Sequence, residues 1–408
     1  MTSSAATEVR EAERGPEAGL SSPVVAIAVL AAAHFLVDLF SGTINPLWRG
    51  FEERFLMLEG DLLWVVFVWY AANSVTQVAF GWWADRGRRQ WVIWAGALTG
   101  IVCLGSVGLT GSQWSLAALV FVGGLGIASF HPEGAATAGA IAPNHRSRMM
   151  AIFALCGYLG QSVGPFYSSR WTGEFGLPAL AWGGLVGAGL LLMLSTQRRH
   201  LPSLPVAARG VGRADRPPIP VGRAVLLLAI GSLRITPAVG APLVLAYWLT
   251  DLELIGTLQS VFMAGIGSGS IVCAIAIGPR WERPVLWLFP LLAAPCLLVI
   301  PVVERGLLIA AVGASGVVLG VAMPVFISYG QQMLPHHARA ASSITMGASW
   351  GLASAASWSI VWVCKQFDRF DYGDAFVPLA LTSGVAAVLS LQLPHLKRPS
   401  PESRESES

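Results

Sequence analysis

Charged residues are scarce in this sequence. Only 12% of its 408 residues are Asp, Glu, Lys or Arg, 54% are hydrophobic, and the mean hydropathy is +0.62. Soluble domains carry roughly 25% charged residues, so this composition excludes an ordinary soluble protein. The sequence also lacks ten-residue stretches of alternating apolar and polar residues. Because transmembrane strands require that alternation, only helices remain to cross a membrane.

Cysteine is also sparse and shows no grouping that would suggest chemistry. Five cysteines occur singly in apolar runs, without a C-x-x-C pair: Cys103, Cys156, Cys273, Cys296 and Cys364. The helical zinc motif H-E-x-x-H is absent as well. We therefore predict inert packing cysteines, no metal centre, no cofactor and no enzymatic activity.

Long apolar runs account for most of the sequence, and a helix needs about 20 residues to cross a bilayer. We predict an all-α membrane protein with twelve transmembrane helices, over 23–46, 61–84, 91–110, 114–141, 148–169, 179–196, 224–249, 256–278, 285–303, 307–333, 340–364 and 376–393. The polar interval 197–223 divides them into two six-helix bundles, 23–196 and 224–393, with polar tails at 1–22 and 394–408.

Positive charge is distributed unevenly between the loops. Most of the 26 lysines and arginines fall in the two tails, in the interval 197–223 and in the other loops on that side. Basic residues concentrate in cytoplasmic loops, so we predict an inner (plasma) membrane protein with both termini in the cytoplasm. This excess explains the net charge of +3 without a nucleic-acid partner, and we expect a monomer.

Five ionisable residues fall within the predicted helices: His34, Asp38, His131, Glu133 and Arg234. His34 and Asp38 are four residues apart and share one helix face. A charge at mid-bilayer costs roughly 2.5–3.5 kcal/mol, so such residues are functional candidates. We predict that Glu133 carries a proton, that His131 tunes it, and that Asp38 and His34 belong to the same proton-coupling group. Arg234 then holds an anionic substrate group or competes for the same carboxylate.

Two other interpretations of these residues stay open. The charges can form a static network that orients the helices, with Arg234 neutralising Asp38 or Glu133. The His, Asp and Glu side chains are also acceptable zinc ligands, which leaves an intramembrane metalloenzyme as a minor alternative.

A weak internal repeat relates the two halves. At an offset of 192 residues, Pro132 meets Pro324, and both prolines are expected to break or kink their helices. His131 then falls opposite Met323, so the ionisable groups lie mainly in the first half. Chance similarity between apolar segments is the alternative to a true repeat. We predict that Met323 and Trp350 help Arg234 to line the substrate cavity.

Two glycine-rich motifs resemble those of the major facilitator superfamily. Residues 81–89 read Gly-Trp-Trp-Ala-Asp-Arg-Gly-Arg-Arg and resemble its cytoplasmic signature loop, with one residue fewer between Arg86 and Gly87. The resemblance implies a cytoplasmic gate formed by Gly81, Asp85, Arg86, Arg88 and Arg89. In the fifth helix, a small-residue face similar to the Gly-Pro motif of the superfamily's antiporters is formed by Gly157, Gly160, Gly164 and Pro165. Plain helix packing explains that face equally well.

A pair of short blocks resembles one branch of that superfamily. Residues 33–38 read Ala-His-Phe-Leu-Val-Asp and residues 130–134 read Phe-His-Pro-Glu-Gly. This pairing is similar to the fosmidomycin-resistance branch, as is the segment 329–335. The resemblance implies two bundles around a central cavity, alternating access, and proton-driven export of a small compound that is anionic, such as a phosphonate.

The predicted function is therefore secondary transport across the membrane, as an exporter driven by inward proton flow. A proton-coupled importer built from the same residues is the main alternative, because fold and charge placement do not set direction. A sensor or scaffold is less favoured, since no segment is long enough for an additional soluble domain.

Overall fold

The structure is a computed structural model that describes residues 23–84, 91–142, 145–202, 218–277, 279–334, 341, 343–367 and 370–395. Within these ranges all regular secondary structure is helical. The predicted interval 197–223 and both predicted tails fall largely outside the described residues, as do Asp85, Arg86, Arg88 and Arg89 of the gate motif.

The long helices of the first half are α2 (Pro23–Thr43), α4 (Leu63–Tyr70) with its continuation α5 (Thr76–Ala84), α6 (Trp91–Gly105), α7 (Gln113–Ile141), α8 (Arg146–Phe175) and α9 (Leu180–Ser195). Those of the second half are α10 (Val221–Trp248), α11 (Leu252–Ala276), α12 (Glu282–Val299), α13 (Arg305–Met333), α15 (Ser349–Gln366) and α16 (Phe376–Ser390). This order confirms the prediction of twelve transmembrane helices.

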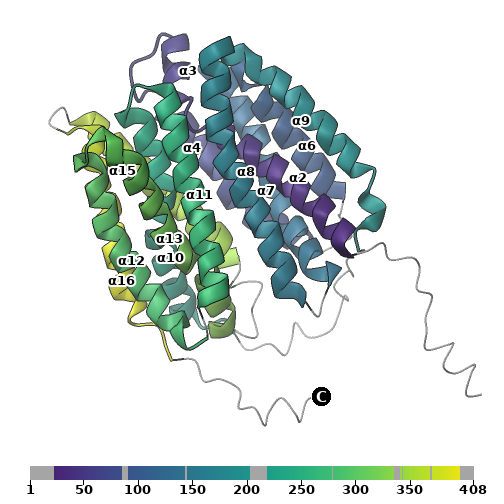
Figure 1. The fold of residues 1–408 in the computed structure, drawn as a ribbon, viewed down its shortest axis with the longest axis vertical. Coiled ribbons are helices and arrows are strands. Elements are labelled where there is room, and N and C mark those ends of the chain that lie inside the picture. Colours follow the sequence, from purple (N-terminus) through teal and green to yellow (C-terminus); the bar gives the residue numbers. More distant parts are fainter. Residues whose placement is uncertain are drawn as a thin grey trace, which may run out of the picture.

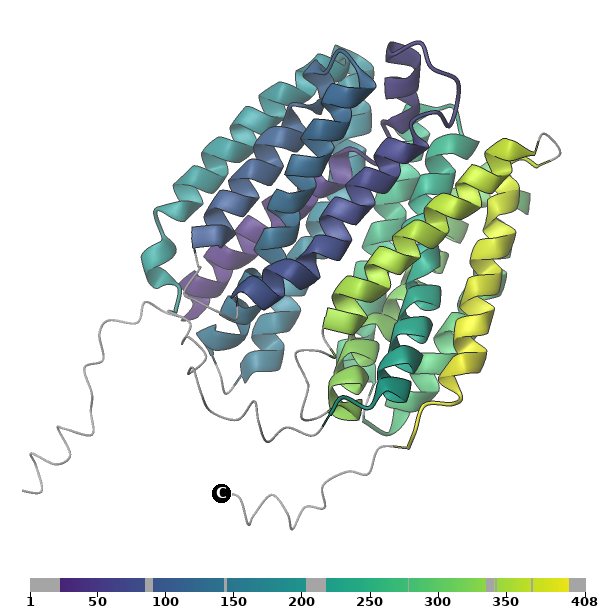
Figure 2. The same ribbon diagram turned by 180° about the vertical axis from the view of Figure 1, so that it is seen from behind.

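The helices form two groups that lie side by side. Figure 1 shows the purple-to-teal helices beside the green-to-yellow ones, and Figure 2 shows the same division from behind. Helix α8 packs on α2 of its own group and on α11 of the other. We call the side where α2 begins and α16 ends the terminal face, and the other side the opposite face.

Eleven of the segments are long and apolar enough to cross a membrane by composition alone. The remaining one is α15 with the preceding π-helical segment η9 (Ser343–Ala348). Its hydropathy is reduced by four serines in α15 and by Lys365 and Gln366 at its end. A second π-helical segment, η1 (Ala71–Val75), joins α4 to α5 and contacts η9.

The structure adds one helix that the sequence did not predict and contradicts the helix breaks expected at two prolines. The interval between the first two transmembrane helices contains the short helix α3 (Trp48–Arg54), four of whose seven residues are charged. The prolines Pro132 and Pro324 do not end their helices, since α7 and α13 run continuously through them. Packing by neighbouring helices lets membrane helices tolerate proline.

Small residues set the contact between α2 and α8. A Cβ atom on Gly160 would lie 2.3 Å from the carbonyl oxygen of Phe35, and one on Gly164 would lie 2.3 Å from that of Leu39. Gly42 on α2 packs on Pro165 in the same seam. The glycine motif of the fifth helix therefore allows the two backbones to touch, as small residues do between membrane helices.

We expect Gly160→Ala to destabilise the protein, because the added methyl group meets rigid backbone atoms of α2. Overpacking of this kind costs roughly 1–3 kcal/mol. Gly173→Ala on the same helix is the matched control, since a Cβ atom there meets nothing within 4 Å. Thermal unfolding in detergent micelles measures both variants, and equal unfolding temperatures would contradict this account of the seam.

Candidate functional site

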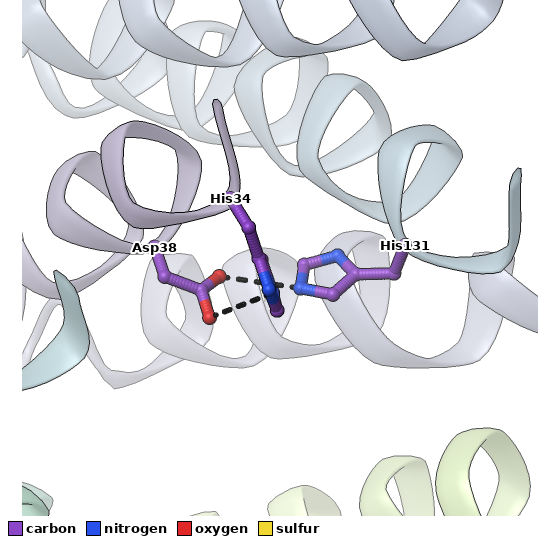
Figure 3. Close-up of side chains that lie close together, drawn as sticks. All are labelled: His34, Asp38 and His131. Carbon is purple, nitrogen blue, oxygen red and sulfur yellow. Dashed lines mark hydrogen bonds and ion pairs between the residues drawn. The ribbon is translucent and has the colours of Figure 1, made fainter. Parts of the chain in front are cut away.

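Three ionisable side chains from α2 and α7 meet inside the first group of helices. His34 and Asp38 lie one turn apart on α2, and His131 approaches from α7 (Figure 3). The Nε2 atom of His34 lies 3.3 Å from Oδ2 of Asp38, and the Nε2 atom of His131 lies 3.2 Å from Oδ1. Each imidazole therefore faces a different oxygen of one carboxylate.

Both imidazoles are held by backbone carbonyls through their other nitrogen. Nδ1 of His34 lies 2.7 Å from the carbonyl oxygen of Phe153, and Nδ1 of His131 lies 2.8 Å from that of Ile127. A carbonyl oxygen only accepts, so each Nδ1 atom carries the hydrogen. In a neutral imidazole the Nε2 atom is then a bare acceptor that faces the carboxylate.

This geometry defines what the cluster binds. Two acceptor nitrogens and an ionised carboxylate repel one another, so a proton on either imidazole stabilises its contact with Asp38. His131 makes this contact as a hydrogen bond, whereas Nε2 of His34 has no hydrogen-bond partner. The three donor atoms lie within 4.8 Å of one another, which also leaves room for a divalent cation in place of protons. The three atoms are thus placed where they could accept a proton or a divalent cation.

The surroundings of the cluster are apolar and tightly packed. The His34 ring stacks on Phe153 with 3.9 Å between ring centroids and also contacts Phe130. Gly157 of α8 packs against His34 and Asp38, because a Cβ atom there would lie 2.5 Å from Cε1 of His34. His34 and Asp38 are buried, whereas the His131 side chain is 22% exposed, so electrostatic interactions are strongest between the first two.

Glu133 lies outside this three-residue cluster, although it is buried as predicted. It follows His131 by two residues, and an α-helix turns about 100° per residue, so the two side chains leave α7 on different sides. The structure therefore brings Asp38, His34 and His131 together, with Asp38 at the centre.

Arg234 is the buried cation of the second group of helices. It lies midway along α10 and its residue is only 2% exposed. Its Nη2 atom lies 3.4 Å from the Met323 sulfur, and its guanidinium lies 4.8 Å from the Phe326 ring centroid. Among the described residues no carboxylate pairs with it, and its Nε and Nη1 atoms have no hydrogen-bond partner. The predicted neutralisation of Asp38 by Arg234 is therefore absent from this arrangement.

Two residues that sequence reasoning missed connect these sites. Tyr158 on α8 lies within electrostatic range of both Asp38 and Arg234, and its side chain packs on Gly267 of α11. Gln161, one turn further along α8, donates to Oδ2 of Asp38 at 3.4 Å. Both are polar side chains in an otherwise apolar helix, and this pattern could have marked them as candidates. They are interleaved with the glycines of the small-residue motif.

Gln161 also reaches a pocket between the two groups of helices. The wall from the first group comprises Ser41, Gly42, Asn45, Trp69, Tyr70, Asn73, Ser74 and Gln161. The wall from the second comprises Ala238, Val239, Pro242, Met263, Trp350 and Ser354. Trp350 lies in the wall of this pocket, and Ala238 lies one helical turn from Arg234. Arg234 and Met323, which were also expected to line the cavity, are not among the residues that line this pocket. Of the gate motif, Gly81 is described and packs near Pro132.

Comparison with known proteins identifies relatives along most of the chain. The family model described as Major Facilitator Superfamily matches residues 30–357. The fosmidomycin resistance protein of Escherichia coli is 22% identical over 345 residues, which cover 80% of this chain and 83% of that protein. An uncharacterized MFS-type transporter, YfnC, of Bacillus subtilis is also 22% identical, with the same coverage.

Solved structures share the fold. The nucleoside transporter NupG superposes with a TM-score of 0.68 at 13% identity, covering 90% of this chain and all of that one. A D-xylose-proton symporter superposes with a TM-score of 0.67 at 16% identity, covering 92% and 98%.

Substitutions at His131 test the hydrogen-bond assignment at the cluster. The amide nitrogen of Gln occupies a place near Nε2 and can still donate to Asp38, whereas that of Asn is too short to reach. We expect His131→Asn to be less stable than His131→Gln by about 1 kcal/mol, the value of one such bond. Denaturant or thermal unfolding in micelles measures this difference, and a more stable Asn variant would refute the assignment.

Proposed function

The chain belongs to the Major Facilitator Superfamily and is a membrane transporter, and from that premise we propose that it is a proton-coupled exporter of a small anionic compound. The observation that carries the proposal is the arrangement of two buried sites beside one central pocket. A cluster that can bind a proton lies in the first group of helices. Arg234, which pairs with no carboxylate among the described residues, lies in the second.

The proton site is assigned to Asp38, His34 and His131. His131 is hydrogen-bonded to Asp38 through Nε2, and His34 Nε2 lies 3.3 Å from the other carboxylate oxygen, so a proton on either imidazole stabilises the cluster. Gln161 connects Asp38 to the pocket wall. When the proton is released, the lone pair of an imidazole Nε2 atom faces a carboxylate oxygen. The two repel each other, which favours a different arrangement of α2 and α7. This links proton occupancy to conformation, as alternating access requires. Glu133, the carrier predicted from the sequence, remains a second candidate for the same role.

The anion site is assigned to Arg234. A buried guanidinium stays protonated and is costly to leave unpaired. Its Nε and Nη1 atoms have no hydrogen-bond partner and can each donate to an oxygen of a phosphonate, phosphate or carboxylate. Met323 supports the guanidinium and Trp350 forms the pocket wall nearby. Outward transport is favoured by the relative named fosmidomycin resistance protein.

The terminal face is assigned to the cytoplasm, and the two six-helix bundles are assigned as the units that move. The terminal face is cytoplasmic because the predicted loops there hold most of the basic residues. The units that rock against each other are residues 23–196 and 224–393. Small-molecule substrate, protons and the lipid bilayer are then the only partners the cycle needs, and we expect a monomer to complete it.

Proton movement in inverted membrane vesicles tests the coupling. With an acidic interior imposed, a panel of phosphonates and other small anions should collapse the pH gradient in the wild type. We expect Asp38→Asn to abolish this response, because an amide cannot release a proton. Glu133→Gln is compared in parallel and reduces the response only if Glu133 is also a carrier.

Three results would contradict the proposal. Substrate-evoked collapse that survives in Asp38→Asn removes the cluster from the coupling step. Substrate entry with protons into right-side-out vesicles, with no exchange in inverted ones, indicates a symporter for uptake. Saturable binding of Zn²⁺ that requires Asp38 and both histidines, and that weakens as the pH falls, would instead indicate that the cluster holds a metal ion.

Removal of the guanidinium tests the anion site. We expect Arg234→Gln to weaken binding of the transported anion roughly 10- to 100-fold, since charge-assisted hydrogen bonds contribute about 1.5–3 kcal/mol. Arg305→Gln is the matched control, because the Arg305 side chain is 75% exposed and pairs with Asp251 at the opposite face. Ligand-induced thermal stabilisation of the purified variants measures the affinity, and equal affinity in both variants would contradict the assignment.

A further inference from the structure

Glu52 is a buried carboxylate that the transport mechanism above does not use. It lies on α3 at the opposite face, outside the membrane-spanning helices, and is only 1% exposed. Its Oε1 atom accepts a hydrogen bond of 2.9 Å from the backbone amide of Leu62. Its Oε2 atom is buried without a hydrogen-bond partner.

The same carboxylate joins the two groups of helices. The hydroxyl of Tyr247 on α10 donates to Oε1 of Glu52 at 3.3 Å. The Tyr247 ring packs on the Tyr372 ring, so the contact lies within a layer of aromatic side chains from the second group. Arg49, one turn before Glu52, donates to the carbonyl oxygen of Leu249 in the loop after α10. The short helix α3 is thus fastened to the second group at two points.

From this geometry we propose that Glu52 is a second proton-binding site, and that its protonation holds the opposite face closed. In the closed arrangement the carboxyl is buried between the two groups, with one oxygen unpartnered. A neutral carboxyl tolerates this position, whereas a carboxylate is expensive to bury without a counter-charge. Loss of the proton therefore favours separation of α3 from Tyr247, which lets water reach the carboxylate.

The titratable and charged groups around Glu52 do not duplicate this behaviour. They are Arg49, Glu59, Asp61, Tyr247, Lys365 and Tyr372. Glu59 is partly exposed and pairs with Arg49 at 3.3 Å, while Asp61 forms an ion pair with Lys365. The hydrogen bond from Lys365 holds the pKa of Asp61 below its ordinary value, so Asp61 stays ionised at neutral pH.

The direction of the pH effect follows from burial. Burial raises the pKa of Glu52 from 4.5 to about 7, although interactions with the backbone of Leu62 and Gly60 and with the Tyr247 hydroxyl oppose the shift. A carboxyl that is exposed in the open arrangement has its ordinary pKa. The closed arrangement is therefore favoured fully below about pH 4.5, and this advantage is lost as the pH rises to about 7. Above that value the contribution is constant.

This sign suits a transporter whose opposite face meets the more acidic compartment. External protons would bind Glu52 after the opposite face has opened and would favour its closure. The proposal concerns the closing of one face and does not depend on the identity or direction of the transported compound.

Spin-label distance measurements on the full-length protein test the proposal without substrate. Labels on Leu58→Cys and Val302→Cys report the separation of the two groups at the opposite face, since both positions are exposed loop or short-helix sites. The native cysteines and Asp38 are replaced in this background, so that the central cluster adds no pH response. We expect the open-to-closed ratio to rise by up to tenfold per pH unit from pH 5 to 7 and then to level off.

Three variants give the deciding comparisons. Glu52→Gln mimics the protonated form and should stay closed at every pH. Glu59→Gln is the control and should respond as the background does. Tyr247→Phe removes a donor to the carboxylate, so its midpoint should move to higher pH, whereas simple loosening of the interface would change the ratio equally at every pH. An unchanged pH response in Glu52→Gln would overturn the proposal.

Discussion

A charge placed in the hydrocarbon layer has to find its partner within the protein, and this constraint organises the whole molecule. Asp38 satisfies it with two imidazoles whose orientation is fixed by backbone carbonyls. Those carbonyls are positioned by α7 and α8, which in turn depend on close contact between α8 and α2. The glycines of that contact are therefore as necessary to the cluster as its own side chains.

The two halves meet the same constraint in different ways. In the first half, Asp38 pairs with two histidines of the same half. In the second half, Arg234 contacts only a sulfur atom and an aromatic ring, which are weak partners for a cation. Tyr158 lies between Asp38 and Arg234 on α8, the helix that packs on both α2 and α11. A change of charge at Asp38 or at Arg234 therefore changes the electrostatic potential at α8, the helix that contacts both halves.

Most of the fold could be predicted from the sequence, because apolar runs of sufficient length have few alternatives in a bilayer. Helix α3 could not be, since its charged residues are typical of an exposed loop. Of the candidate site, the pairing of His34 with Asp38 follows from their spacing, and the burial of Arg234 from its apolar neighbours. Which carboxylate His131 would meet depends on how α7 is rotated, and hydropathy carries no information about rotation in a helix that is apolar on all sides.

The π-helical segments η1 and η9 each place an extra residue, compared with an α-helix, at the interface between the two halves. A π turn holds one residue more than an α turn, and η1 and η9 contact each other across this interface. Taking up one such residue would turn the rest of the helix by about 100° and advance it by about 1.5 Å. The pocket residues Tyr70, Asn73 and Ser74 lie in or beside η1. Conversion of the π turn to an α turn would therefore be enough to exchange the side chains that face the pocket, while the backbone hydrogen bonds stay within a helix.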